Sequence, residues 1–279
     1  MDGIHPSTSS SMRLCIPLAT LASCALAAFL PVASAQVIAQ WNFNSVVPDA
    51  STGSGSVLSS FGSGSASLIG GVSGSFAAGS PRDSAPDNSA WSLGSWPSQG
   101  TGSGTAGAQF MVSTLGVHEA IQVSFDLRQT PTASERFQLQ ATIDGVNFSN
   151  VSGGLASWGS VGNNTATSFD SSGLFVNTVS SSNQAFVQSI TYTFITDSGF
   201  ENNANFGVRL VSVFEGSSYD ASGATANYGA GGLVRLDMMT VSSAPPAVPE
   251  PATSALLMGV AALAAVLWRR SHPCRSQQC

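Results

Sequence analysis

The chain has 279 residues, and only 9% of them are charged, against roughly a quarter in typical soluble domains. It contains no lysine, and between residues 36 and 251 fourteen acidic residues outnumber five arginines, which leaves a net charge of −9. Because phosphate binding needs clustered lysine and arginine, this composition argues against nucleic acid as a partner.

The first predicted element is a secretory signal peptide over residues 1–35. An apolar run over residues 14–32 is followed by Ala33 and Ala35, and small residues at these −3 and −1 positions favour cleavage before Gln36. We therefore expect the chain to be exported through the inner membrane, with the mature body beginning at Gln36.

Two alternatives for this segment stay open, and so does its start. Residues 21–24 match the pattern of a lipoprotein signal, in which Cys24 would be acylated, but the apolar run continues for eight residues beyond it. A membrane anchor is the other alternative, although Pro17 and Pro31 interrupt the run. The first ten residues do not resemble the start of a signal peptide, which favours translation from Met12.

Residues 36–243 contain runs that alternate between apolar and polar side chains, a pattern that predicts β-strands. Asp144 and Gly145 join two such runs, and Asp-Gly in this position is a strong signal for a β-hairpin. Because alternation buries one face of a sheet and leaves the other in water, we expect an all-β fold, an antiparallel β-sandwich of jelly-roll type. The strands are predicted at residues 37–43, 121–127, 137–143, 190–195, 206–214 and 233–241.

Two long segments between these runs, residues 51–80 and 94–107, are rich in glycine and serine and are predicted as loops. Short strands within residues 57–61 and 66–72 are an alternative for part of the first segment. Residues 244–248 form a proline-rich spacer after the body.

The body offers few groups for catalysis. All four cysteines lie outside it, at positions 15, 24, 274 and 279, so it has neither a disulfide framework nor a cysteine metal site. Its one histidine, His118, is predicted in a turn and cannot supply a zinc site alone. Asp197, Glu201 and nearby asparagines could offer oxygens to Ca²⁺, but a polar turn explains them better. We expect no catalytic residue, no metal, no cofactor and no enzymatic activity.

Three tryptophans, Trp91, Trp96 and Trp158, lie in stretches that are predicted as loops. Exposed aromatic rings can stack on sugar rings, so these three are candidate glycan-stacking residues. The alternative is that their rings fold back and cap the core. Arg128 and Asp237, both on predicted strands, are expected to pair as a structural contact.

An apolar segment near the C-terminus predicts a membrane-spanning helix. Residues 252–268 carry no charge, and these 17 residues reach the lower limit of the roughly 17–25 that span a bilayer. Arg269 and Arg270 follow, and positive charge beside an apolar span stays on the cytoplasmic side. The body is therefore expected outside, with residues 272–279 as a cytoplasmic tail. A buried core helix is the alternative, but every face of the segment is apolar.

The residues before this span make the prediction more specific. Pro249, Glu250 and Pro251, followed by the span and then by the two arginines, resemble the PEP-CTERM sorting signal of Gram-negative bacteria over residues 249–271. The resemblance implies recognition by exosortase, a membrane-embedded cysteine transpeptidase that would cut near the Pro-Glu-Pro and pass the body to the surface. The two prolines keep the cut site extended, as a protease requires.

The strand pattern between residues 37 and 241 also resembles lectin-like or carbohydrate-binding jelly-roll domains of exported bacterial proteins. The resemblance implies the fold and suggests a sugar ligand, but it transfers no binding residue. It is carried by the strand pattern together with Trp41, Arg128, Arg209, Arg235 and Asp237.

These observations lead to one main hypothesis and two alternatives. The main hypothesis is a non-enzymatic exported protein of the cell surface or extracellular matrix, held transiently in the inner membrane and processed by exosortase. The first alternative is a carbohydrate-binding module, which makes an extracellular polysaccharide a candidate partner. The second is an extracellular hydrolase, for which no set of catalytic residues stands out.

Overall fold

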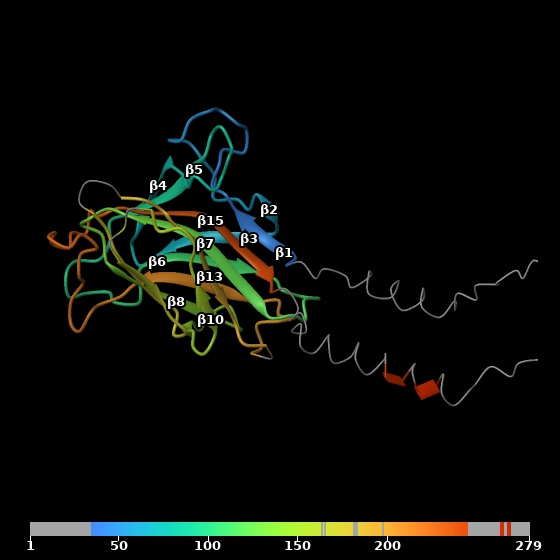
Figure 1. Cartoon of the computed structure of the whole chain (residues 1–279). Helices are drawn as coiled ribbons and strands as arrows, with labels where there is room; N and C mark the ends of the chain where they lie inside the picture. Colours follow the sequence, from blue (N-terminus) through green and yellow to red (C-terminus); the bar gives the residue numbers. More distant parts are fainter. Residues whose placement is uncertain are drawn as a thin grey trace, which may run out of the picture. The chain divides into compact units, whose positions relative to one another are not determined.

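A computed structural model describes residues 35–162, 164, 166–180, 184–196, 198–244, 263–264 and 267–268. Between residues 35 and 244 the described residues form fifteen β-strands and no helix, which confirms the all-β class (Figure 1). The strands make two antiparallel sheets, so the β-sandwich is confirmed as well. Its jelly-roll connectivity stays a prediction.

The first sheet contains eight strands. They are β1 (Val37–Trp41), β2 (Phe61–Gly62), β4 (Ser73–Ala78), β5 (Ser89–Gly94), β7 (Ile121–Gln129), β10 (Leu155–Ser157), β13 (Val187–Thr193) and β15 (Val234–Ser243). Their order is β10-β13-β7-β15-β1-β2, and the first part of β15 also pairs with β5, which in turn pairs with β4. The long strand β15 therefore holds two separate partners along one edge.

The second sheet contains seven strands. They are β3 (Gly64–Ile69), β6 (Gly107–Val112), β8 (Arg136–Thr142), β9 (Ser149–Asn150), β11 (Ala166–Phe169), β12 (Leu174–Thr178) and β14 (Gly207–Ser212). Their order is β11-β12-β8-β14-β6-β3, with β9 beside β8. The predicted strands at 37–43, 121–127, 137–143, 190–195, 206–214 and 233–241 correspond to β1, β7, β8, β13, β14 and β15, with ends shifted by up to three residues.

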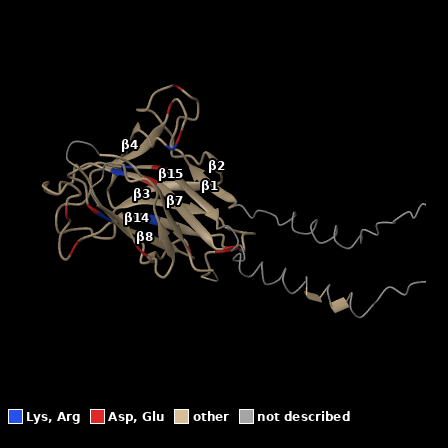
Figure 2. Cartoon of the chain, viewed as in Figure 1, with Lys and Arg blue, Asp and Glu red and all other residues tan. Residues whose placement is uncertain are grey.

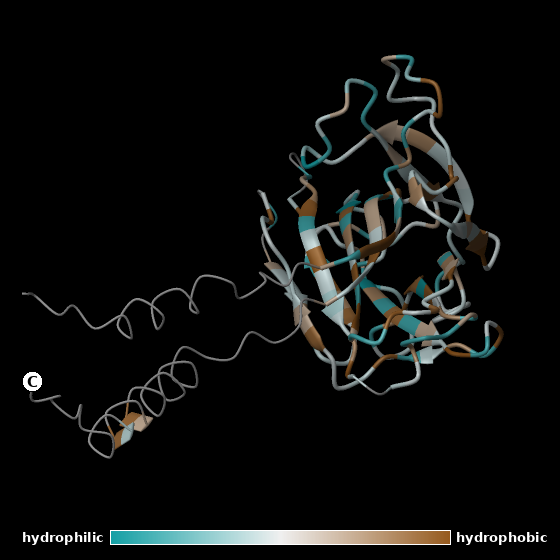
Figure 3. Cartoon of the chain, turned by 90° about the vertical axis from the view of Figure 1, so that its right-hand side faces the viewer, coloured by the Kyte–Doolittle hydropathy of each residue, from teal (hydrophilic) through white to brown (hydrophobic). Residues whose placement is uncertain are grey.

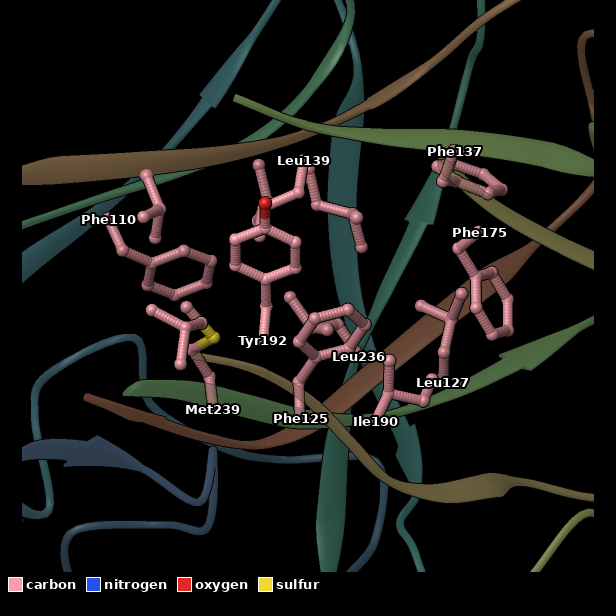
Figure 4. Close-up of a cluster of buried hydrophobic side chains, with 14 of the residues drawn as sticks. Phe110, Phe125, Leu127, Phe137, Leu139, Phe175, Ile190, Tyr192, Leu236 and Met239 are labelled. Carbon is pink, nitrogen blue, oxygen red and sulfur yellow. The ribbon is translucent and has the colours of Figure 1, made fainter. Parts of the chain in front are cut away.

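The core lies between the two sheets and follows from the alternation of the strands. On β7 the side chains of Val123, Phe125 and Leu127 are at most 1% exposed, whereas the polar residues between them lie on the opposite face. Figure 4 shows Phe125 and Leu127 on one side of this space, with side chains of the second sheet such as Phe110 and Phe137 on the other. In Figure 3, hydrophobic and hydrophilic residues alternate along the strands. Burial of these rings supplies the main stabilisation of the fold.

Two β-bulges change which residues face the core. On β15 the register with β7 shifts between Asp237 and Thr240, so that Leu236 and Met239 both face inward. Met238 has a φ of 50°, a left-handed conformation that is uncommon for a residue with a side chain. A similar shift on β13 places Ser189 at a φ of 53°. Without these bulges, the alternation of side chains would continue unchanged, and every later side chain of the two strands would face the opposite side of the sheet.

The segment 51–80 is not one long loop, which corrects the prediction, because it contains β2, β3 and β4. The sequence prediction also missed β5 and β6, at either end of the loop expected over residues 94–107. These strands consist largely of glycine, alanine and serine, whose small side chains give no clear alternation. The segment SAWSLG of β5 is buried at all six positions, so it shows no polar face at all.

The predicted hairpin at Asp144 and Gly145 is confirmed. Gln140 and Ala141 of β8 pair with Asn150 and Ser149 of β9. The Asp144 Oδ1 atom accepts hydrogen bonds from the backbone N–H groups of residues 146 (2.9 Å) and 147 (2.7 Å), and Gly145 has a φ of 77°. An aspartate that accepts backbone hydrogen bonds, followed by a glycine with positive φ, is the expected chemistry of a tight turn.

The ends of the body meet at one place. The N–H of Gln36 donates to Ser243 Oγ (3.0 Å), and the N–H of Ser243 donates to the Gln36 carbonyl (2.9 Å). Ala35 is exposed. The other residues predicted for signal cleavage and sorting lie outside the described residues: Ala33, Pro249, Glu250, Pro251, Arg269 and Arg270. No helix among the described residues has both the length and the apolar character needed to cross a membrane. The predicted domain limits stay predictions.

Candidate functional site

Two of the three tryptophans predicted to stack on sugars are buried. Trp91 lies on β5, is 4% exposed and packs against the rings of Phe43 (5.5 Å between centroids) and Phe110 (6.3 Å). Trp96 is also 4% exposed, and its ring lies 5.5 Å from that of Phe137. Neither ring is available to a ligand, because burial between the sheets covers both, which corrects the expectation for these two residues.

Trp158 is the exception. It follows β10 and is 39% exposed. The neighbouring backbone is held in place, since the N–H of Gly159 donates to the Gln188 carbonyl (2.8 Å) and the N–H of Gln188 donates to the Ser160 carbonyl (2.8 Å). A stacking role therefore stays a prediction for Trp158 alone.

The outer face of the first sheet carries two buried carboxylates side by side. Asp126 of β7 and Asp237 of β15 are opposite each other in the register, and both are 0% exposed. Ser80 covers them: its N–H donates to Asp237 Oδ2 (2.6 Å) and its hydroxyl donates to Asp126 Oδ2 (2.6 Å). The second oxygens accept from the bulge N–H groups of Ser189 (2.8 Å) and Met238 (2.7 Å). This pair therefore satisfies the backbone donors that the two bulges release.

Burial disfavours charge on both groups. Burial raises the pKa of Asp237 to about 8, and the charge of Asp126 raises it by a smaller amount. The hydrogen bonds from Ser80 and Met238 act in the opposite direction and lower this pKa. Burial also raises the pKa of Asp126, whereas the hydroxyl of Ser80 and the charge of Arg82 oppose the shift. Arg82 Nε lies 3.4 Å from Asp126 Oδ2. Arg82 therefore forms its ion pair with Asp126, and burial favours the protonated form of Asp237.

Two arginines occupy the next positions of the same outer face. Arg128 and Arg235 are directly opposite each other on β7 and β15. Arg128 Nε donates to the Gln184 carbonyl (3.0 Å), and Arg235 Nη1 donates to the Ala78 carbonyl (3.1 Å). The expected pairing of Arg128 with Asp237 does not form, because the register places arginine against arginine and aspartate against aspartate. In the described part of the chain no carboxylate lies within 4.0 Å of either guanidinium.

A cavity of about 380 Å³ lies over this arginine pair. Burial lowers the pKa of Arg235, and the positive charge of Arg128 lowers it further. Figure 2 shows that charged residues are sparse in the body, so two adjacent cations are a local concentration of charge. The cavity is lined by Arg128, Arg235, Ser160, Gln184, Phe186 and Gln188, among others.

A second cavity, of about 500 Å³, lies beside β10 and the end of β13. Its wall includes Leu155 and Ile195, which are 75% and 56% exposed, and a single acidic residue, Glu119. It lacks a set of converging polar groups, which usually gives a binding site its specificity. The arginine cavity is the better candidate site.

Of the residues weighed for catalysis or metal binding, the structure describes His118 and Glu201. His118 is exposed, and its backbone N–H donates to Glu119 Oε2 (3.3 Å). Asp197 lies outside the described residues. The carboxylate groups of Glu135, Glu215 and Asp220 come within 4.8 Å of one another, but Arg136 forms an ion pair with Glu215 and so supplies their positive charge.

Comparison with known families identifies one match, at the C-terminus. Residues 247–271 match the PEP-CTERM protein-sorting motif. A search among curated proteins finds no match. The motif covers the Pro-Glu-Pro, apolar and arginine segments, which supports the prediction that the chain is an exported substrate of exosortase. It carries no information about the body.

Proposed function

We propose that this protein is a non-enzymatic component of the cell surface or extracellular matrix, delivered there by exosortase processing. The sorting motif at residues 247–271 is the observation that supports delivery. The cysteine-free, weakly charged β-sandwich supports a binding or structural role rather than a catalytic one.

The motif suits a three-step route. Residues 252–268 hold the precursor in the inner membrane, and Arg269 with Arg270 keep the short tail on the cytoplasmic side. Pro249 and Pro251 exclude a helix at the cut site, so exosortase meets an extended chain. The body, folded outside, is then passed to the surface.

Removal of the signal tests the route. In the native host, deletion of residues 248–270 should send the body into the medium or stall its export, as measured by fractionation and immunoblotting. Replacement of Pro249, Glu250 and Pro251 by alanine should instead leave the uncut precursor in the membrane fraction. Mass spectrometry of the mature C-terminus should place the cut near Glu250.

A matched control keeps the charge while changing the side chain. Arg269→Lys with Arg270→Lys should be processed normally, because both residues still mark the cytoplasmic side. If the deletion variant is localised and processed like the wild type, the sorting proposal is wrong.

A second candidate function is carbohydrate binding, supported by the exposed ring of Trp158 near Ser160 in the sequence. Ser160, which lines the cavity, follows Trp158 by two residues. Aromatic rings beside a few polar groups are typical of sugar sites. Binding to a glycan array that weakens in Trp158→Ala would support this function, whereas a blank array of bacterial and algal polysaccharides would argue against it.

A further inference from the structure

We propose that the cavity over Arg128 and Arg235 binds an acidic sugar of an extracellular polysaccharide, through a carboxylate or sulfate held by both guanidinium groups. This inference rests on the second candidate function, carbohydrate binding, and specifies the chemistry of the ligand. It depends on three features: an opposed pair of like charges, the lack of a neutralising carboxylate, and a cavity over the pair.

The opposed arginines are unfavourable without an anion. Arg128 and Arg235 are direct partners across β7 and β15, and like charges in this position destabilise an antiparallel pair. The body contains five arginines in all, and two of them are placed here. A bound oxyanion would replace this repulsion by two charge-assisted hydrogen-bonding contacts.

The nearest acidic groups do not neutralise the pair. Asp126 and Asp237 lie two residues away on the same strands, but their oxygens accept hydrogen bonds from Ser80 and from the bulges. Asp126 has its own cation in Arg82. Burial raises the pKa of Asp237 to about 8, so this group carries little negative charge at pH 7. The positive charge beneath the cavity is therefore uncompensated by the described residues.

Both guanidinium groups retain donors for a ligand. Arg128 uses Nε and Nη2 on the carbonyl and side chain of Gln184, which fixes the plane of its guanidinium. Arg235 uses Nη1 on the Ala78 carbonyl. Within the described part of the chain, Arg128 Nη1 and the Nε and Nη2 of Arg235 have no hydrogen-bond partner. Two forked donors suit an oxyanion with two or three oxygens.

The size and lining of the cavity favour a sugar over a bare ion. Its volume of about 380 Å³ lies in the range of about 300–1,000 Å³ that holds small organic ligands. Ser160 and Gln188 can serve sugar hydroxyls, and Phe186 supplies an apolar wall. The net charge of −9 repels polyanions at long range, so that binding requires a local match at the arginines.

The test compares charge-matched variants of the purified protein. Arg128→Gln and Arg235→Gln each remove one cation of the cavity, whereas Arg209→Gln removes a cation placed over the Phe148 ring, away from the cavity lining. Binding to polygalacturonate, dextran sulfate, neutral dextran and inorganic phosphate is measured by calorimetry at low and moderate salt. The wild type should bind an acidic polymer but not neutral dextran.

Each cavity variant should weaken this binding by about tenfold to a hundredfold, since a charged hydrogen bond contributes about 1.5–3 kcal/mol, and the double variant should abolish it. Arg209→Gln should bind like the wild type. In the absence of ligand the double variant should still unfold in one cooperative transition, because the lost repulsion offsets the lost hydrogen bonds to Gln184 and Ala78, and this separates lost binding from lost folding.

Other results would overturn the proposal in distinguishable ways. Equal binding of the polymer by the double variant would place the acidic group elsewhere. Equal affinity for inorganic phosphate and for the acidic polymers would show a simple anion site with no sugar preference. Binding of neutral glycans that depends on Trp158 alone would keep carbohydrate binding but refute an acidic ligand. Failure of every polysaccharide to bind would refute both, while leaving the sorting proposal untouched.

Discussion

On the outer face of β7 and β15, two aspartates and two arginines stand in neighbouring rows and have opposite roles. Asp126 and Asp237 are sealed beneath Ser80 and hold the backbone of two bulges. Arg128 and Arg235 line a cavity and keep donors for a ligand. The type of side chain alone does not determine these roles. The segment around Ser80 covers the aspartate pair and leaves the arginine pair open to the cavity.

The raised pKa of Asp237 predicts a decline of stability with rising pH. The folded state holds this proton up to about pH 8, whereas an unfolded aspartate releases it near its ordinary pKa of 3.8. Between these two pH values the folded state binds more protons, so the free energy of unfolding falls as pH rises, by at most about 1.4 kcal/mol per pH unit from this group. Urea unfolding measured from pH 4 to pH 9 should show the decline.

Asp237→Asn should flatten this decline, because the amide does not titrate. Asp144→Asn is the matched control: hydrogen bonds from Asn147 and Val146 lower the pKa of Asp144, so its contribution to stability is lost only as pH falls below the range of unfolded aspartate. A slope between pH 5 and pH 8 that persists in Asp237→Asn would contradict the assignment to this residue.

At the scale of elements, β5 shows how a strand escapes sequence prediction. Its segment SAWSLG has no alternation, because β5 is buried on both faces and pairs with β15 on one edge and β4 on the other. The same burial turns Trp91 from a candidate sugar platform into a core residue. The bulges at Ser189 and Met238 could not be predicted from the sequence either, because they depend on how each strand pairs with its neighbour.

This view of β5 can be tested by truncating its ring. Trp91→Ala should reduce the free energy of unfolding by about 3–5 kcal/mol, the usual cost of removing a buried large aromatic side chain. Trp158→Ala, which removes a 39% exposed ring, should change it by less than about 1 kcal/mol. Equal losses in denaturant titrations of the two variants would mean that β5 does not pack as described.

At the scale of the whole molecule, the body is stabilised without covalent cross-links. Its core joins strands from both sheets into one cluster, and all four cysteines lie outside residues 36–270. A body of this length buries enough apolar surface to fold without disulfides.

The mature body purified from its host should therefore melt at the same temperature with and without a thiol reductant. Calorimetric scans in the two conditions provide the comparison, with a disulfide-bonded protein as a control for the reductant. A reductant-dependent drop of several degrees would mean that the purified protein retains cysteines from outside residues 36–270 and that their cross-link stabilises the body, since a disulfide typically contributes about 2–4 kcal/mol.

The sequence by itself determined the features that depend on neighbouring residues. Alternating side chains predicted β7, β8, β13, β14 and β15, and Asp144 with Gly145 predicted a hairpin. The Pro-Glu-Pro, apolar and arginine segments formed a recognisable sorting signal. Each of these signals is contained within a few consecutive residues, because strand periodicity, turn chemistry and processing motifs act locally.

Only the tertiary structure decided which residues meet. Arg128 and Arg235 are more than one hundred positions apart, and a shift of two residues in the β7–β15 register would have placed Arg128 opposite Asp237, the pair expected from the sequence. The burial of Trp91 and Trp96, the two bulges and the cavity likewise arise from pairing between distant strands. Such pairing is selected by the packing of the entire core, which no short segment encodes.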